Sequence, residues 1–167
     1  MSGLAFAPIF DLEDRDDVTT WHAPQSRAWC KTRGLPMPTL YDNRKPPTSR
    51  AADITRALTI QKPPLHEVAF FGFGSSRSIQ AGYHVDDVPM LARLLVAATT
   101  EQSVVEIHAV DPIVDTSGLC ADDGFAAQLA KQMRISGRWT GRVVAYACCP
   151  EGEIAREFDG VGRGRWL

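Results

Sequence analysis

One apolar run in this chain ends abruptly in a glycine- and serine-rich loop, and this feature constrains the fold most. Val68–Phe71 has the composition of a buried strand, and Gly72–Ser78 follows it directly. In α/β proteins, ligands and reactive groups usually lie where a buried strand ends in such a loop. Between Phe71 and Ile79, however, the chain has no His, Cys, Asp or Glu. The segment therefore has the frame of an active site without its reactive side chains.

The second half of the chain alternates between strand and helix patterns. Residues 89–98 and 125–133 carry apolar side chains at helical spacing, and residues 103–110 and 141–148 are largely apolar runs of strand length. Strands that alternate with helices of this length are typical of a mostly parallel sheet covered on both faces. We therefore predict an α/β fold, a three-layer αβα domain with a mostly parallel sheet.

Aspartates stand where these two helices are expected to begin. Asp86 or Asp87 precedes the first helix, and Asp122 or Asp123 precedes the second. Their short carboxylate side chains are good acceptors for the first free N–H groups of a helix. We predict that they cap the two helices.

The whole chain, 1–167, is predicted to form a single domain. Its 167 residues, of which 44% are hydrophobic and 23% charged, are ordinary for one globular domain with a sizeable core. Residues 66–150 are the expected core, and 1–65, with eight of the eleven prolines, are an expected irregular first part. The tail, 151–167, is expected to be flexible or to dock onto a neighbour.

Short elements are nevertheless predicted within the proline-rich part, because apolar and capping patterns recur there. In chain order, they are a strand at 18–21, a helix at 24–31, a strand at 39–41 and a helix at 50–58.

Charge and composition exclude several classes of function. The formal net charge is −2, whereas neutralising several phosphates of a nucleic acid takes a Lys/Arg-rich face. The N-terminus meets Asp11, Glu13 and Asp14 before any long apolar run, so we expect neither a signal peptide nor a membrane span. The sequence predicts a soluble protein with no nucleic-acid or membrane partner.

The cysteines and histidines do not form a metal-binding pattern. Zinc sites usually show closely spaced pairs such as C-x-x-C or H-x-x-x-H, and the chain has neither. We therefore expect free thiols, no metal and no cofactor. The residues concerned are Cys30, Cys120, Cys148, Cys149, His22, His66, His84 and His108.

Three short motifs along the chain are shared with one known family. They are Phe70-Phe71-Gly72-Phe73-Gly74, Ile79-Gln80-Ala81-Gly82 and Asp122-Asp123-Gly124-Phe125-Ala126-Ala127-Gln128-Leu129, with a weaker likeness at 20–29. Together they resemble a bacterial and phage-associated branch of the caspase-like cysteine peptidases, in which the strand typically reads Phe-Phe-Cys-His-Gly. The resemblance implies the caspase/haemoglobinase fold over most of the chain. It also implies a location in the cytoplasm or within a phage-like particle.

The resemblance implies a His–Cys dyad, from which this chain departs. The family's His falls on Phe73, and a phenyl ring cannot accept a proton. The family's nucleophile ends a strand of the type Val-Val-x-Tyr-Ala-Cys, for which two stretches compete. Residues 104–109 keep the family's order of elements and place Ala109 at the nucleophile, whereas 143–148 match the motif better and place Cys148 there. We favour the first alignment, because the order of elements is harder to lose than two residues.

Three functions follow from these observations. The first is a catalytically inactive caspase-like domain, a pseudopeptidase that binds a protein or peptide or acts as a structural module, as part of a phage or phage-like particle. The second is an active cysteine peptidase that uses Cys148 with His84 or His108. The third is a small-molecule-binding α/β domain that uses the glycine- and serine-rich loop.

Each catalytic candidate also has a simpler structural interpretation. Cys148 is a small apolar residue that would complete a core strand. His108 would be a half-buried polar residue of a strand, and His84 a loop residue before a helix. Activation of the thiol would require a histidine within hydrogen-bond distance and a lowered pKa.

The loop after Val68–Phe71 supplies the predicted ligand-binding residues. Glycines let backbone N–H groups converge on an anion, and an arginine adds charge. The loop lacks both common nucleotide-binding fingerprints, so a tight turn is the simpler interpretation. Asp111, together with Asp115, would bind a basic side chain at the next strand end. The predicted ligand-binding residues are Gly72, Gly74, Ser75, Arg77 and Asp111.

Overall fold

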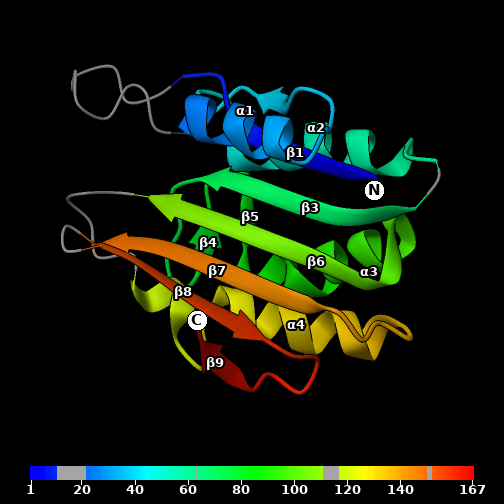
Figure 1. Ribbon diagram of the computed structural model, residues 1–167, viewed down its shortest axis with the longest axis vertical. Coiled ribbons are helices and arrows are strands. Elements are labelled where there is room, and N and C mark those ends of the chain that lie inside the picture. The colour runs from blue at the N-terminus through cyan, green and yellow to red at the C-terminus, as the bar shows by residue number, and fades with distance from the viewer. Residues whose placement is uncertain (11–21, 63, 111–116, 150–151) are drawn as a thin grey trace.

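The computed structural model describes residues 1–10, 22–62, 64–110, 117–149 and 152–167, which form a sheet with helices on both faces (Figure 1). The sheet has seven strands in the order β2-β1-β3-β6-β7-β8-β9. The first five are parallel, and β8 and β9 are antiparallel to their neighbours. The strands are β1 (Gly3–Pro8), β2 (Thr39–Tyr41), β3 (Leu65–Gly72), β6 (Thr99–Val110), β7 (Arg142–Cys149), β8 (Gly152–Phe158) and β9 (Gly164–Trp166).

Four α-helices and a small hairpin complete the described part of the fold. The prediction of a three-layer αβα domain with a mostly parallel sheet is confirmed. The helices are α1 (His22–Thr32), α2 (Pro47–Thr59), α3 (Val88–Ala98) and α4 (Phe125–Ser136); the hairpin is β4 (Ser78–Ile79) with β5 (Tyr83–His84), and the short helices are η1 (Val85–Asp87) and η2 (Ser117–Cys120).

Alternating side chains in the central strands divide the core between two helical layers. Ala5 and Ala7 of β1 pack with Trp29 of α1, whereas Phe6 packs into the larger cluster formed with α2, α3 and α4. In Figure 1, α1 lies on the near side of the sheet, and α3 and α4 lie behind it. The near face of β6, β7 and β8 carries no helix within the described ranges. Within the described residues, α2, α3 and α4 therefore cover one face of the sheet and α1 covers part of the other.

The first part of the chain is more regular than its prolines suggested. The helices predicted at 24–31 and 50–58 and the strand predicted at 39–41 are present as α1, α2 and β2. The strand predicted at 18–21 lies outside the described residues. β1 was not predicted from the sequence, because its core-facing Ala5 and Ala7 have little strand propensity of their own.

The predicted aspartate caps were only partly correct. Asp87 is the N-cap residue of α3, but its side chain accepts a hydrogen bond from the backbone N–H of His84 and makes no cap bond to α3. The N-cap of α4 is Gly124, not Asp122 or Asp123. The Asp122 carboxylate instead accepts a hydrogen bond from Arg156, at 2.6 Å. The Asp87 carboxylate therefore makes the capping-box contact of η1, and the Asp122 carboxylate binds a residue 34 positions later in the chain.

The tail, predicted to be flexible or to dock, instead extends the sheet as β8 and β9. Arg156 fixes β8 by donating to the carbonyl of Cys120 at 2.9 Å and by lying over the rings of Phe158 and Trp166. Its polar partners come from η2 and the turn after it, so the tail is joined to the helical layer as well as to β7. The hydrogen bonds to Cys120 and Asp122 span 36 and 34 residues, which explains why local sequence patterns missed them.

The carboxyl ends of β3, β6 and β7 meet at one edge of the sheet. Gly72 pairs with Ala109, and Val110 pairs with Cys148. The loops predicted to face a ligand therefore begin side by side. Of those loops, 111–116 and 150–151 lie outside the described residues, and 73–77 is described. No helix in the described part of the chain is long and apolar enough to cross a membrane.

Candidate ligand-binding site beside strand β3

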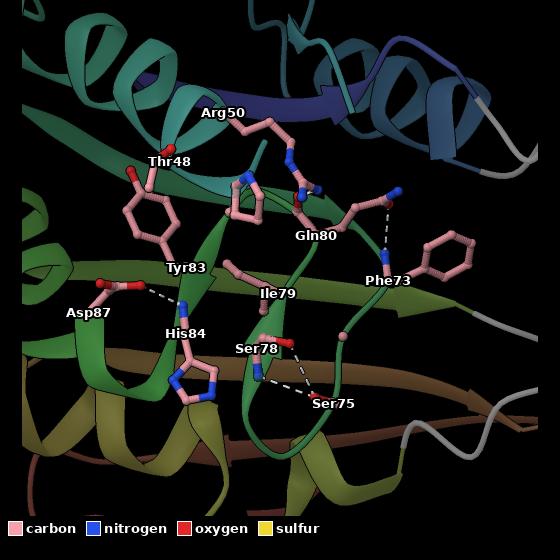
Figure 2. Close-up of a pocket in the computed structure, with 13 residues that line it drawn as sticks. Thr48, Arg50, Phe73, Ser75, Ser78, Ile79, Gln80, Tyr83, His84 and Asp87 are labelled. Atoms are coloured by element: carbon pink, nitrogen blue, oxygen red, sulfur yellow. Dashed lines mark hydrogen bonds between the residues drawn. The ribbon is translucent and has the colours of Figure 1, made fainter. Parts of the chain in front are cut away.

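A cavity of about 660 Å³ opens beside the carboxyl end of β3 (Figure 2). Its walls are the loop 73–75, the hairpin 78–84, the first turn of α2 and Asp87 at the start of α3. It lies on the side of the sheet that carries α2 and α3. Apolar and polar side chains both line it, as is usual for small-ligand or peptide pockets.

The loop after β3 closes on itself through hydrogen bonds. Gln80 joins both ends of Phe73: the Gln80 N–H donates to the Phe73 carbonyl at 2.8 Å, and the Phe73 N–H donates to Gln80 Oε1 at 3.0 Å. Ser75 Oγ accepts from the N–H groups of Arg77 and Ser78 at 3.1 and 3.2 Å. These N–H groups are used within the loop, so the segment is a tight turn rather than an open cradle for an anion.

Only some of the predicted ligand-binding residues that the structure describes line the cavity. Gly74 and Ser75 line the cavity, whereas Arg77 is exposed and does not. Gly72 is buried with a φ of +143°, and a Cβ there would lie 2.5 Å from the Tyr41 hydroxyl. Gly72 is therefore required for packing behind the site. Asp111 lies outside the described residues.

Sequence reasoning missed the residues that attach the hairpin to α2. Arg50 Nη1 donates to the carbonyl of Gln80, and the Tyr83 hydroxyl donates to the carbonyl of Ala51 at 3.1 Å. In Figure 2 the Arg50 side chain descends from α2 toward Gln80 at the upper wall of the cavity. No motif marked Arg50, because its partner lies thirty residues later in the chain.

The two positions that the resemblance assigns to a dyad are close together. Ala109 is opposite Gly72 in the sheet, and a Cβ on Gly74 would lie 2.9 Å from the Ala109 Cβ. Phe73, between these glycines, packs edge-on against the buried His22 ring, with 5.3 Å between ring centroids. The two positions hold a phenyl and a methyl group, neither of which takes part in proton transfer.

The three catalytic candidates do not form one cluster of described side chains. His84 lines the cavity, where its Nδ1 lies 3.1 Å from Asp86 Oδ2. His108 lies on the other face of the sheet, stacked between Phe71 and Tyr146 at 4.3 and 4.4 Å. Cys148 pairs with Val110 near the end of β7, and its side chain is outside the described part of the structure.

His108 belongs to a buried polar network that holds α1 against the sheet. Its Nε2 lies 2.7 Å from Oε2 of Glu106, a residue only 6% exposed. The same carboxylate accepts from Trp29 Nε1 at 2.8 Å and from Arg33 Nη2 at 3.1 Å. Arg33 also donates to Glu67 at 2.7 Å. The network therefore explains the polar residues of β6 without a catalytic role.

The acidity of Glu106 gives a prediction for the pH dependence of stability. Burial raises the pKa of Glu106. Hydrogen bonds from His108 and Trp29 and the positive charges of His108 and Arg33 lower it by more than burial raises it, so the pKa is below its ordinary value. Glu106 therefore stabilises the fold above its unfolded-state pKa of about 4.3, and this contribution disappears as pH falls through the folded-state pKa. We expect the free energy of unfolding, measured by urea titration at stepped pH, to fall below about pH 5, and to fall less steeply in Glu106→Gln.

Glu101→Gln is the control for this measurement, because Glu101 is an exposed residue of the same strand. This variant should keep the wild-type dependence on pH. An equally steep fall in wild type and Glu106→Gln would show that Glu106 does not carry the effect.

Comparison with protein-family models, curated proteins and solved structures found no match to this chain. In the part of the chain that the structure describes, no group of three or more His, Cys, Asp or Glu side chains is placed to hold a metal ion.

Proposed function

We propose that this protein is a catalytically inactive caspase-like module that binds a peptide or protein partner, as a component of a phage or phage-like particle. One observation supports the proposal: Gly72 and Gly74, which flank Phe73, lie against Ala109 at the carboxyl edge of the sheet, and Phe73 and Ala109 are the dyad positions implied by the resemblance. Neither a phenyl nor a methyl group can act as a nucleophile or a base. A site with these side chains at the two positions is therefore expected to bind a peptide without hydrolysing it.

The cavity supports a binding role. It lies directly beside Phe73, has a volume of about 660 Å³ and is bordered by backbone and side-chain polar groups. Pockets of this size bury a few side chains of a peptide or one small ligand. The hydrogen bonds within the loop keep its shape without a ligand, so little conformational entropy is lost on binding.

An active peptidase that uses Cys148 is the second candidate. Residues 143–148 match the family's nucleophile strand, and Cys148 pairs with Val110 at the carboxyl edge of the sheet. In this case a histidine would have to approach Cys148. His84 and His108 lie on opposite sides of the sheet, so at most one of them could act as the base for Cys148.

Incubating the protein with a peptide library and detecting products by mass spectrometry distinguishes the binding module from the peptidase. For a binding module we expect no cleavage products, and capture of peptides that is unchanged in Cys148→Ala and Cys149→Ala. Cys149 is the matched control, since it is a neighbouring thiol of the same strand. Cleavage that disappears in Cys148→Ala but persists in Cys149→Ala would establish the peptidase instead.

A further inference from the structure

We propose that the cavity beside β3 binds a carboxylate of an extended peptide, and that Arg50 is the residue that recognises it. This inference rests on the proposed function, because it names the partner class of the same site. It commits to a peptide with one carboxylate and adjacent apolar side chains.

The state of the Arg50 guanidinium points to an anionic ligand. Arg50 lines the cavity and is half-buried. Its Nη1 donates to the Gln80 carbonyl, a neutral acceptor, whereas its Nε is buried without a hydrogen-bond partner. Among the described residues, no carboxylate lies within ion-pair distance of Arg50. A partly desolvated cation without a counter-charge is costly, and a ligand carboxylate would remove that cost.

The first turn of α2 adds positive potential at the same wall. The helix has thirteen residues, no acidic residue in its first turn, and Pro46 as an N-cap residue that makes no side-chain hydrogen bond. Pro47 has no N–H, and the N–H groups of Ser49 and Arg50 donate to the Pro46 carbonyl, so the Thr48 N–H and the helix dipole are what remains uncompensated by side chains. Thr48 of this turn also lines the cavity. The helix end and the Arg50 charge favour an anion together.

The opposite wall limits how much negative charge the ligand can carry. Asp87 lines the cavity, where its carboxylate accepts a hydrogen bond from the backbone N–H of His84 at 2.8 Å. The other titratable groups beside it are the Tyr83 phenol, the His84 ring and Asp86, which is bound to that ring. A fixed carboxylate would repel a phosphate dianion more than a monoanion. A single carboxylate therefore fits the balance of charges better than a phosphate.

A second cavity extends the site beyond one side chain. It has a volume of about 420 Å³, lies between α2 and α3, and shares Thr48, Gly82 and Asp87 with the first. Met90, 45% exposed, lines its far end. Two adjoining cavities, one beside Arg50 and one largely apolar, suit successive side chains of an extended peptide. A small free acid would fill only the first.

Two arrays of the same random short peptides test the inference, one with free C-terminal carboxylates and one with amidated C-termini. We expect captured peptides to require a carboxylate. Binding only on the first array identifies the C-terminal carboxylate, and binding of Asp- or Glu-containing peptides on both identifies a side chain. The affinity of a captured peptide for Arg50→Gln should be weaker by about tenfold or more, since hydrogen bonds between charged groups are the strong ones.

Two further variants make the result specific to Arg50. Arg93→Gln removes the same charge from an exposed position of α3 that lines neither cavity, and should leave affinity within about twofold of wild type. Thr48→Glu places a negative charge at the exposed start of α2, where the helix dipole favours it, so the fold should persist while binding falls.

The outcomes separate this inference from the proposed function. Peptides that bind without a carboxylate, or bind Arg50→Gln and Thr48→Glu as well as wild type, would overturn the role of Arg50 and leave the binding module intact. No captured peptide on either array would overturn both.

Discussion

Replacing Glu106 with alanine is expected to lower the free energy of unfolding by about 3 kcal/mol, because it removes the acceptor at the centre of a buried network. The Glu106 carboxylate accepts hydrogen bonds from Trp29 and Arg33 and lies against the His108 ring nitrogen. Alanine would leave the indole N–H of Trp29 buried without its acceptor and would take one counter-charge from Arg33. Urea unfolding followed by circular dichroism measures the change.

Glu101→Ala is the matched control, since it removes a carboxylate from an exposed position of the same strand. Its free energy of unfolding should stay within about 0.5 kcal/mol of wild type. If Glu106→Ala were as mild as this control, the network would contribute little to the stability of the fold.

The network matters because α1 is the helical cover of one face of the sheet within the described residues. Its apolar contacts with the sheet form a small cluster around Trp29 and Phe71. The bonds from Trp29 and Arg33 to Glu106 reach across to β6 and orient the helix. Side-chain polar contacts therefore supplement the limited apolar area of this layer.

The general fold could be predicted because its signals are local. Apolar spacing in 89–98 and 125–133 and the strand runs 103–110 and 141–148 are properties of neighbouring residues, and each corresponds to an element of the structure. β8 and β9 were missed, because the charged residues of this edge region become strands only when β8 pairs with β7 and β9 pairs with β8.

The site could be predicted only in part, because contacts between residues that are distant in sequence leave no local pattern. The loop after β3 was located from its glycines, and Gly74 and Ser75 do line the cavity. Arg50 was missed, because a helix surface arginine becomes a binding group only when the hairpin at Gln80 folds against it. Similarly, the environment of His108 depends on Trp29 of α1 and on Arg33 in the turn after it, more than seventy residues earlier.

The junction between the hairpin and α2 gives the second large effect. Gly82 has a φ of +102°, and a Cβ there would lie 2.2 Å from the carbonyl oxygen of Pro47 and 3.0 Å from the backbone nitrogen of Ala51. Both neighbours are helix backbone atoms, which cannot move aside as a flexible side chain would. We expect Gly82→Ala to lower the free energy of unfolding by about 3 kcal/mol, through backbone strain and displacement of the hairpin.

Gly34→Ala separates these two causes, because Gly34 also has a positive φ, +65°, but nothing within 4 Å of a Cβ. This variant should cost only about 1 kcal/mol of backbone strain in the same urea titration. The excess in Gly82→Ala then measures the close contact between hairpin and helix together with the greater backbone strain of alanine at a φ of +102°. Because Gly82 borders both cavities, Gly82→Ala should also lose peptide capture, whereas Gly34→Ala should keep it. Equal costs in the two variants would mean that the hairpin moves freely and that its contact with α2 does not shape the site.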